Sequence, residues 1–290
     1  MKHAVLILAH NNFSVVKALL EQLDSPNFDI YIHINAKVKS FPEEELKKSV
    51  SRAKLKFVKR YKIGYCDYSM VMGVKSLLET ASQTYHDYYH LVSGADMMIK
   101  KREEFDCFFE ENNGKEFVGF SKDYTEERVK YRNFFVAQGR QRSAFLSKLF
   151  IKLRKSLITV QKTFGIEYKN IPGFETKKGT DWYSITHLAV EYLLKMEPQF
   201  KKGFYYTYCP TEFFAQTLLW NSDFRKNLYC NDTISENRQC VRQIDWDRGS
   251  PYVYRMSDKD ELLNSKEMFA RKFDENNDME IVNFLKENIK

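Results

Sequence analysis

The sequence predicts one α/β domain with a mainly parallel central sheet of the Rossmann type and a more elaborate C-terminal third. Three observations support this prediction. The chain has 290 residues and is 43% hydrophobic, which is enough to bury a sizeable core. Its first 35 residues have the pattern of a strand, a helix and a strand, a βαβ unit whose crossover should be right-handed. No internal repeat, low-complexity tract or linker divides the chain.

Apolar runs alternate with helical periodicity through the first half of the chain. Val5–Ala9 is a nearly continuous apolar run, which is typical of a parallel strand covered on both faces. Further strands are expected over 29–35, 54–58, 88–93 and 116–120. Helices are expected over 14–23, 69–84 and 101–112, where apolar residues recur at helical spacing.

Polar residues stand at the ends of these predicted strands, which is where sheets of this kind bind ligands. His10 follows the first strand, and His33 and Asn35 end the second. Each histidine is either a satisfied polar group or part of a nucleotide site. Asp96 follows the fourth strand and either completes a turn or contacts a sugar or a metal ion. It is a single aspartate, followed by two methionines, so the paired-aspartate signature of a metal–diphosphate site is missing and a divalent ion is not expected.

Two stretches in the middle of the chain have two alternative interpretations each. Residues 125–135 mix charges with aromatic rings, and they form either a solvated helix face or a platform for an acceptor sugar. Residues 140–164 form a basic amphipathic segment that contains no acid. Its basic residues are Arg140, Arg142, Lys148, Lys152, Arg154, Lys155 and Lys162. This segment either binds a membrane surface or a partner groove, or packs on the domain with its basic side chains extending into solvent.

The stretch 208–222 contains the main candidate for a catalytic residue. A helix is expected to begin at Pro210 or Thr211, with Thr211 as its N-cap. Glu212 falls in the first turn. It either complements the helix dipole or acts as a general base, because a helix N-terminus holds a carboxylate more rigidly than a loop does.

The remaining elements are shorter. A short strand over 179–186 is expected to expose Trp182. The other predicted elements are a loop over 165–178, a helix over 187–196, a strand-like segment over 241–254, a capped helix from Ser257 and a last helix over 279–290.

Charge and cysteine content limit the setting of the protein. The net charge of +7, from 46 basic and 39 acidic residues, suggests an anionic partner such as a sugar nucleotide, a phosphate or an acidic lipid. Nucleic-acid binding is not expected, because no nucleic-acid fold signature is present. The five cysteines lack C-x-x-C spacing, which argues against a zinc site and favours free thiols in a reducing cytosol. No apolar stretch reaches about 18 residues, so no membrane span is expected.

Several short motifs occur in an order that resembles one enzyme family. They are Ile7–His10, Tyr31–Asn35, Arg60–Ser69, Leu91–Asp96, Gly179–Tyr183, Pro210–Leu218 and Leu263–Phe273. Together they resemble the core-2/I-branching β-1,6-N-acetylglucosaminyltransferases and the peptide O-xylosyltransferases of glycosyltransferase family 14. The resemblance extends over about residues 3–275 and implies a single GT-A-like domain. It also implies transfer of a sugar from a UDP donor, with N-acetylglucosamine as the first candidate. The transfer would invert the anomeric configuration and would need no metal.

The resemblance assigns the chemical roles. Glu212 is similar to the base that deprotonates the acceptor hydroxyl, and Arg271 and Lys272 are similar to the cations that hold the donor diphosphate. Arg248 is a further diphosphate contact. Two cations would replace the missing metal on the leaving UDP, and inversion needs one carboxylate base and no nucleophile.

Other residues resemble binding contacts. His10, His33 and Asp96 resemble contacts to the nucleotide and the donor sugar. The acceptor side is represented by Trp182 and by the neighbouring Glu127 and Arg128. Residues 1–120 would then form a nucleotide-sugar-binding half, and residues 121–290 an acceptor- and diphosphate-binding half.

The sequence also departs from the family pattern. Asn35 stands where the family usually has aspartate, Tyr65 stands in place of tryptophan, and Ala95–Met98 replaces Gln-Asp-Tyr-Pro. These departures bear on the donor sugar, and they allow a catalytically inactive relative that binds a glycan or a nucleotide. We therefore expect the chain to lack the anchor and disulfide framework of the animal Golgi enzymes. It resembles a bacterial member in the cytoplasm or on the inner face of the membrane, with a glycan or lipid-linked glycan as acceptor.

Overall fold

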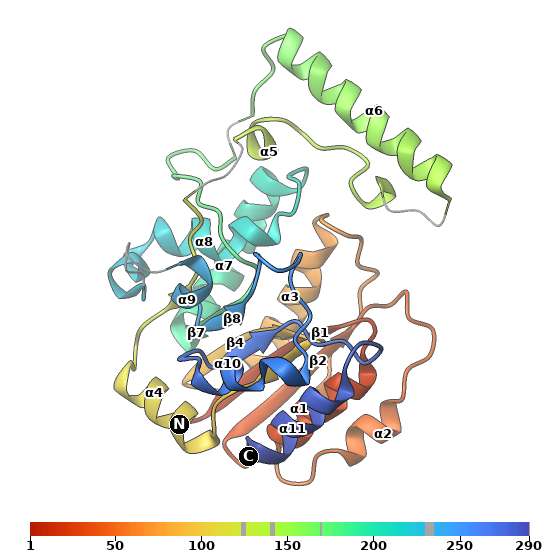
Figure 1. Cartoon of the computed structure of the whole chain (residues 1–290). Coiled ribbons are helices and arrows are strands. Elements are labelled where there is room, and N and C mark those ends of the chain that lie inside the picture. Colours follow the sequence, from red (N-terminus) through yellow and green to blue (C-terminus); the bar gives the residue numbers. More distant parts are fainter. Residues whose placement is uncertain (123–125, 140–142, 169, 230–234, 290) are drawn as a thin grey trace.

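A computed structural model describes residues 1–122, 126–139, 143–168, 170–229 and 235–289 (Figure 1). Its main sheet has six strands in the order β3-β2-β1-β4-β7-β6. These strands are β1 (His3–Ala9), β2 (Phe28–Ile34), β3 (Lys54–Phe57), β4 (Tyr88–Ser93), β6 (Phe117–Val118) and β7 (Tyr183–Thr186). Strands β1 to β4 are parallel, whereas β7 is antiparallel to both of its neighbours. The predicted mainly parallel, GT-A-like α/β fold is confirmed.

The register of the sheet brings several strand ends to one edge. Strand β1 pairs with β2 and with β4 so that Leu8 lies opposite both His33 and Ser93. The carboxyl ends of these strands therefore form a common edge, called the carboxyl edge below. Strand β7 runs the other way, with Tyr183 opposite Leu91, and so the residues just before β7 also lie at the carboxyl edge.

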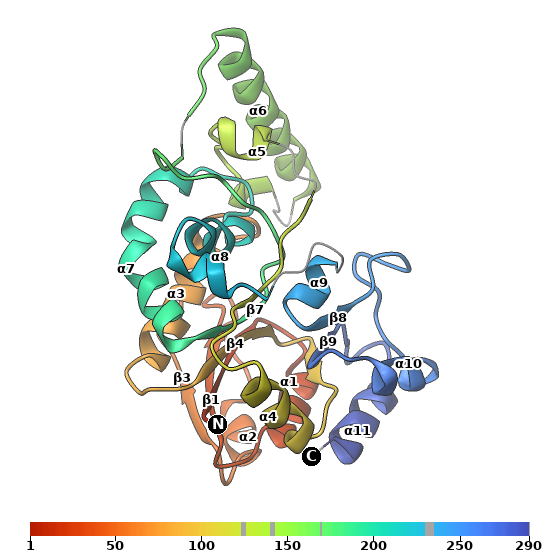
Figure 2. The same ribbon diagram turned by 90° about the vertical axis from the view of Figure 1, so that its left-hand side faces the viewer.

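Helices cover both faces of the main sheet. Helices α1 (Phe13–Gln22) and α11 (Met279–Asn288) pack on one face, and α3 (Ser69–Ala81), α7 (His187–Phe204) and α8 (Thr211–Trp220) lie on the other (Figure 2). Successive residues of β1 alternate between the two hydrophobic clusters, with Val5 in the first and Leu6 in the second. Burial on both faces explains the nearly continuous apolar run of this strand.

A second, three-stranded sheet brings the C-terminal third to the carboxyl edge. It contains β5 (Asp96–Met98), β9 (Phe269–Arg271) and β8 (Arg242–Ile244), in the order β5-β9-β8. The antiparallel pairing of β5 with β9 places Asp96 opposite Arg271. After β9, the Phe273 N–H donates to the Ala95 carbonyl at 2.9 Å, so the chain stays against the end of β4.

The remaining helices include two that were not predicted, over 43–48 and 236–239, and others whose lengths differ from the prediction. They are α2 (Glu43–Lys48), α4 (Arg102–Glu111), α5 (Glu127–Lys130), α6 (Ala144–Thr163), α9 (Glu236–Gln239) and α10 (Lys259–Asn264). Helix α7 does not stop near Met196 as predicted but continues through Pro198, because the fully buried Phe200 and Phe204 anchor its last turns in the core. Of the strand-like segment 241–254, only Arg242–Ile244 is a strand. Within the described part of the chain, no helix is both long and apolar enough to span a membrane.

The prediction of five free thiols is wrong. Cys66 and Cys209 form a disulfide although 143 positions separate them in the sequence. Cys107 and Cys240 are free, and Cys230 lies outside the described residues. The disulfide joins the loop before α3 to the turn that leads into α8. Since the free-thiol argument for a reducing cytosol no longer holds for these two residues, the cytoplasmic location stays a prediction without that support.

We expect the disulfide to stabilise the fold by constraining the unfolded chain. Because the loop that it closes is long, the double replacement Cys66→Ser and Cys209→Ser should lower the free energy of unfolding by about 3 kcal/mol. Urea unfolding with and without a reductant measures this difference. Reductant should destabilise the parent protein and leave the double variant unchanged, with exposed Cys107→Ser as the matched control. Equal stability of the parent and the double variant would contradict the expectation.

Candidate active site

Helix α8 presents Glu212 at its amino end. Pro210 occupies the N-cap position, so the prediction that Thr211 caps the helix is wrong by one residue. Phe213 and Phe214 are buried, as the apolar spacing predicted, whereas the Glu212 side chain is partly exposed. The helix thus fixes the glutamate backbone through its core face and leaves the carboxylate at the surface.

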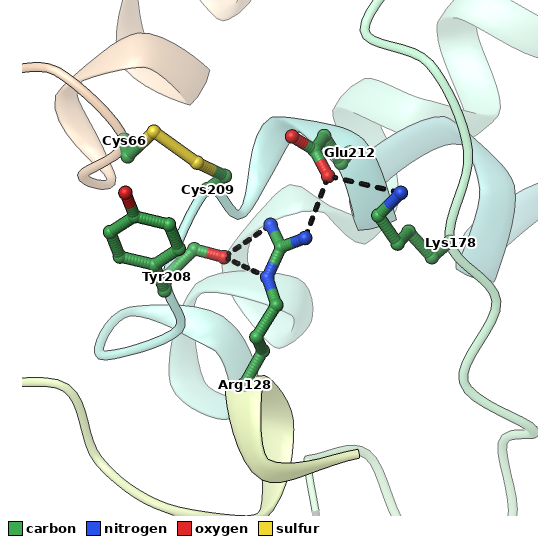
Figure 3. Close-up of a disulfide and its surroundings, with 6 residues drawn as sticks. All are labelled: Cys66, Arg128, Lys178, Tyr208, Cys209 and Glu212. Atoms are coloured by element: carbon green, nitrogen blue, oxygen red, sulfur yellow. Dashed lines mark hydrogen bonds and ion pairs between the residues drawn. A yellow bond between two sulfur atoms is a disulfide. The ribbon is translucent and has the colours of Figure 1, made fainter. Parts of the chain in front are cut away.

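Two cations hold the Glu212 carboxylate (Figure 3). The Arg128 Nη1 donates to Glu212 Oε2 at 2.9 Å, and the Lys178 Nζ lies 3.5 Å from the same oxygen. Arg128 is itself fixed, because its Nε and Nη2 donate to the Tyr208 carbonyl at 3.2 and 2.9 Å. The guanidinium also lies over the Phe213 ring, 5.2 Å from its centroid. Both cations bind Oε2, so the described residues leave Oε1 of Glu212 available to another partner.

Helix α8 also positions the segment just before β7. The Gly179 N–H donates to the Glu212 carbonyl at 2.8 Å, and Gln216 Nε2 donates to the Thr180 carbonyl at 2.7 Å. Glu212 and Gln216 are four residues apart and therefore lie on the same side of the helix. Their contacts place Asp181 and Trp182 at the carboxyl edge, next to Glu212.

Asp181 lies among the charges of the site. Burial raises the pKa of the Asp181 carboxyl to about 6, and the negative charge of Glu212 adds to the rise. The positive charges of Arg271 and Arg128 act in the opposite direction. The pKa of this one carboxyl thus depends on the charges of Glu212, of its partner Arg128 and of the predicted diphosphate ligand Arg271.

This raised pKa predicts a pH-dependent effect of Asp181→Asn on stability. The folded state holds the Asp181 proton more tightly than the unfolded chain, where the pKa is 3.8. The cost of ionisation is therefore absent below pH 3.8, grows up to about pH 6 and is complete above it. The variant should be more stable than the parent by about 3 kcal/mol at pH 8, and this advantage should shrink toward pH 4.

Urea unfolding across this pH range measures the difference between the two proteins. The fully exposed Asp223→Asn is the matched control and should show a difference from the parent that does not change with pH. If Asp181→Asn is less stable than the parent at pH 8, the carboxylate is needed to hold the neighbouring cations and the expectation is wrong.

Arg271 contacts the segment just before β7 through Trp182. Its guanidinium stacks on the Trp182 ring, 4.1 Å from the centroid, and its Nε lies 3.5 Å from Asp96 Oδ1. Asp96 is buried and accepts hydrogen bonds from the Ser93 N–H at 2.9 Å and from the Ser93 hydroxyl at 2.7 Å. Trp182, predicted to be exposed, has only 9% of its surface exposed, partly because Arg271 covers its ring.

Lys272 lies close enough to His10, at the end of β1, for its charge to act on the imidazole. Burial, followed by the positive charge of Lys272, lowers the pKa of the His10 imidazole. His10 is nevertheless an exposed residue of the carboxyl edge. Arg271 and Lys272 therefore both lie at this edge, near residues that follow β1 and β4.

Three predicted site residues have other contacts. His33 is only 1% exposed and accepts a hydrogen bond from the Tyr61 N–H at 2.9 Å, and burial lowers its pKa to about 4. Glu127 pairs with Lys162 of α6. The structure does not bring either residue to Glu212.

Arg248 is the third of these residues. Its guanidinium forms ion pairs with Asp245, Asp258 and Glu261, the last two at 2.9 and 2.6 Å. The positive charge of Arg248 is therefore already balanced by protein carboxylates.

Sequence reasoning missed Lys178, Tyr208 and Gln216 as parts of the site. Lys178 directly precedes the Gly179–Tyr183 motif, and Gln216 lies within the Pro210–Leu218 motif, four residues after Glu212. That spacing was the available signal for Gln216. Nothing in the local sequence indicates that the Tyr208 carbonyl holds Arg128.

A large cavity adjoins the site on the Lys178 side. Its volume is about 950 Å³, and its lining includes Lys178, Phe120, Phe174, Tyr168 and Trp220. Lys178 thus contacts both the cavity and Glu212. Aromatic rings together with charged and amide groups are typical of sites that bind organic ligands. Among the described residues, no group of three or more histidine, cysteine, aspartate or glutamate side chains is arranged to hold a metal ion, and metal independence stays a prediction.

The fold and the site can be compared with known proteins. A family model described as "Branch: Core-2/I-Branching enzyme" matches residues 4–265. The chain belongs to this family. The core-2/I-branching enzymes are glycosyltransferases, which confirms the predicted enzyme class. The residue roles and the location in the cell are not tested by this match.

Curated relatives in the family are named xylosyltransferases. A xylosyltransferase from Ciona intestinalis is 25% identical over 284 residues, which cover 93% of this chain and 32% of that protein. Xylosyltransferase 2 from Rattus norvegicus is 27% identical over 233 residues, which cover 73% of this chain and 24% of that protein. The chain therefore spans about a third or less of the length of these relatives.

A solved structure, mannose-6-phosphate isomerase from Helicobacter pylori, is only distantly similar. It aligns with a TM-score of 0.34 and 12% identity, covering 68% of this chain and 76% of that one. A similarity this weak has no bearing on the function.

Proposed function

We propose that the chain is an inverting, metal-independent glycosyltransferase that moves a sugar from a UDP donor to a glycan hydroxyl. N-acetylglucosamine is the first candidate for this sugar. One observation supports this proposal most directly. Glu212 and Arg271 both adjoin the segment 179–182 at the carboxyl edge, so an acid and a cation border one site. Membership of the core-2/I-branching family supports sugar transfer as the reaction class.

Glu212 is the general base in this proposal. Its Oε1 takes the proton of the acceptor hydroxyl, while Arg128 and Lys178 hold Oε2. The acceptor oxygen then forms a bond to the anomeric carbon, and the bond from that carbon to the UDP oxygen breaks. A single displacement of this kind inverts the anomeric centre and needs one carboxylate, because no covalent intermediate forms.

Arg271 and Lys272 bind the diphosphate of the donor. Negative charge grows on the leaving UDP oxygen in the transition state, and fixed cations at that position stabilise it. Stacking on Trp182 fixes Arg271 before the donor arrives. Lys272 lies beside His10 at the end of β1, where parallel sheets bind nucleotides. His10 then contacts the nucleotide or the donor sugar, while the buried Asp96 holds Arg271 in place.

The cavity beside Lys178 is the proposed acceptor site. It adjoins Glu212 through Lys178, and its aromatic and polar lining suits a sugar chain. Lys178 lines this cavity and pairs with the carboxylate, so it is suited to orient the acceptor hydroxyl toward Oε1.

A panel of UDP-sugars tests the proposal. A donor that binds the folded protein should raise its melting temperature, and transfer to a glycan acceptor should continue unchanged in EDTA. The product should have the opposite anomeric configuration to the donor, which NMR of the new linkage determines. Retention of configuration would exclude the single displacement, and loss of transfer in EDTA that added Mg²⁺ restores would exclude metal independence.

A further inference from the structure

Helix α6 projects from the end of the molecule that lies opposite both chain termini (Figure 1, Figure 2). It has 20 residues over Ala144–Thr163, and it contains no acidic residue. At about 1.5 Å per residue it is roughly 30 Å long. Arg140 and Arg142 of the predicted basic segment lie outside the described residues.

One side of α6 packs on the domain. Gln161 is the one buried residue of the helix, and it exchanges two hydrogen bonds with the Arg132 backbone at 2.9 and 3.1 Å. Arg154 lies over the Tyr208 ring at 4.6 Å, and the Phe150 ring packs 5.7 Å from that of Phe135. At roughly 100° per residue, the three helix residues in these contacts fall on one narrow stripe.

A second stripe of α6 is apolar and faces solvent. Its residues fall within roughly 100° of one another around the helix axis. They are Phe145, Leu146, Leu149, Leu153 and Val160, with 74%, 43%, 49%, 40% and 48% of their surfaces exposed. Phe164, which directly follows the helix, is also 74% exposed. Nothing in the described part of the chain covers this apolar stripe, although large apolar side chains are costly to leave in water.

A third stripe, directly beside the apolar one, is basic. Its charged residues are Lys148, Lys152, Lys155 and Lys162. Only Lys162 of these four has an acidic partner within the described residues, namely Glu127. A solvent-exposed apolar stripe bordered by lysines is typical of helices that lie in the plane of a membrane interface.

We propose that α6 binds the surface of an anionic lipid bilayer, with its apolar stripe inserted among the acyl chains and its lysines on the lipid phosphates. Charge decides between this partner and the alternatives. Two copies of this chain would bring two sets of lysines together, and like charges at an interface are repulsive. Nucleic acid would satisfy the lysines but would leave the apolar stripe exposed, because phosphate binding is electrostatic. An anionic bilayer satisfies both stripes at once.

Docking of α6 would also orient the active site. Arg154 of α6 stacks on Tyr208, whose carbonyl holds Arg128, the partner of Glu212. A bilayer bound to α6 would therefore lie near the acceptor side of the site. This points to a lipid-linked glycan as acceptor, a step that depends on the proposed function, whereas bilayer binding by α6 does not.

Co-sedimentation with vesicles tests the proposal independently of any activity. The full chain should bind phosphatidylcholine vesicles that contain phosphatidylserine and should bind pure phosphatidylcholine at least tenfold more weakly. The double variant Leu149→Ser/Leu153→Ser should lower the partition coefficient by about tenfold at any salt concentration. Lys152→Gln/Lys155→Gln should weaken binding mainly at low salt, where the phosphates are least screened.

Matched controls change the same residue types elsewhere on the surface. Leu188 of α7 is 64% exposed and Lys226 is 82% exposed, so Leu188→Ser and Lys226→Gln should bind vesicles as the parent does. Unchanged thermal unfolding checks that the α6 variants fold. A tryptophan introduced as Phe145→Trp should shift its emission to the blue on anionic vesicles. The proposal is overturned if the α6 variants and the controls bind equally, or if duplex DNA competes fully with the vesicles.

Discussion

Replacement of Glu212 by glutamine is expected to lower kcat by roughly 10³-fold while leaving UDP binding intact. The amide has the shape of the carboxylate, and its oxygen still accepts the hydrogen bond from Arg128. It cannot take the proton of the acceptor hydroxyl, so only the chemical step should be lost. Initial rates of transfer from the accepted UDP-sugar, together with calorimetric titration of UDP, measure the two effects separately.

The matched control for this prediction is Glu191→Gln. Glu191 is an exposed glutamate of α7 whose Oε1 lies 3.5 Å from His187 Nε2. It takes no part in the proposed site. It should transfer sugar at the parental rate. Retained transfer in Glu212→Gln would remove Glu212 from its role as base. If instead the parent protein binds UDP but neither transfers nor hydrolyses any donor, the alternative of a catalytically inactive, nucleotide-binding relative is correct.

The parallel strands of the first half of the chain, and a candidate site at their carboxyl ends, could be predicted from the sequence. Buried parallel strands give nearly continuous apolar runs, and in this chain β1, β2 and β4 do so. Parallel pairing then brings their ends together whatever the side chains are. The position of Glu212 in a first helical turn could be predicted because a helix start has its own local signals, even though Pro210 rather than Thr211 occupies the N-cap position.

The contacts that complete the site could not be predicted in this way. Strand β7 is antiparallel, so its amino end and not its carboxyl end lies at the carboxyl edge, and local periodicity does not reveal strand direction. Trp182 was therefore expected in solvent, whereas Arg271 from a distant strand covers its ring. The pairs Arg128–Glu212 and Cys66–Cys209 likewise join positions far apart in the sequence, and only the topology brings them together.

A second large effect is expected for Arg271→Met. The methionine keeps much of the aliphatic stem but removes the charge that is stacked on Trp182. Without that cation, the charge that develops on the leaving UDP is poorly compensated, and kcat/KM should fall by roughly 10³-fold. The affinity for UDP should fall as well, since the diphosphate carries the same charge before transfer. Steady-state kinetics and UDP titration measure both losses.

Arg248→Met distinguishes a specific role for Arg271 from a general loss of positive charge. Both arginines were predicted to contact the diphosphate, but Arg248 already forms ion pairs with Asp245, Asp258 and Glu261. Arg271 has only the 3.5 Å approach of its Nε to Asp96 among the described residues. Removing a charge that three carboxylates neutralise should change UDP affinity little, and removing one that is only partly neutralised should change it strongly. Equal losses in the two variants would show that net charge, and not the position of Arg271 beside Trp182, determines how this protein binds the nucleotide.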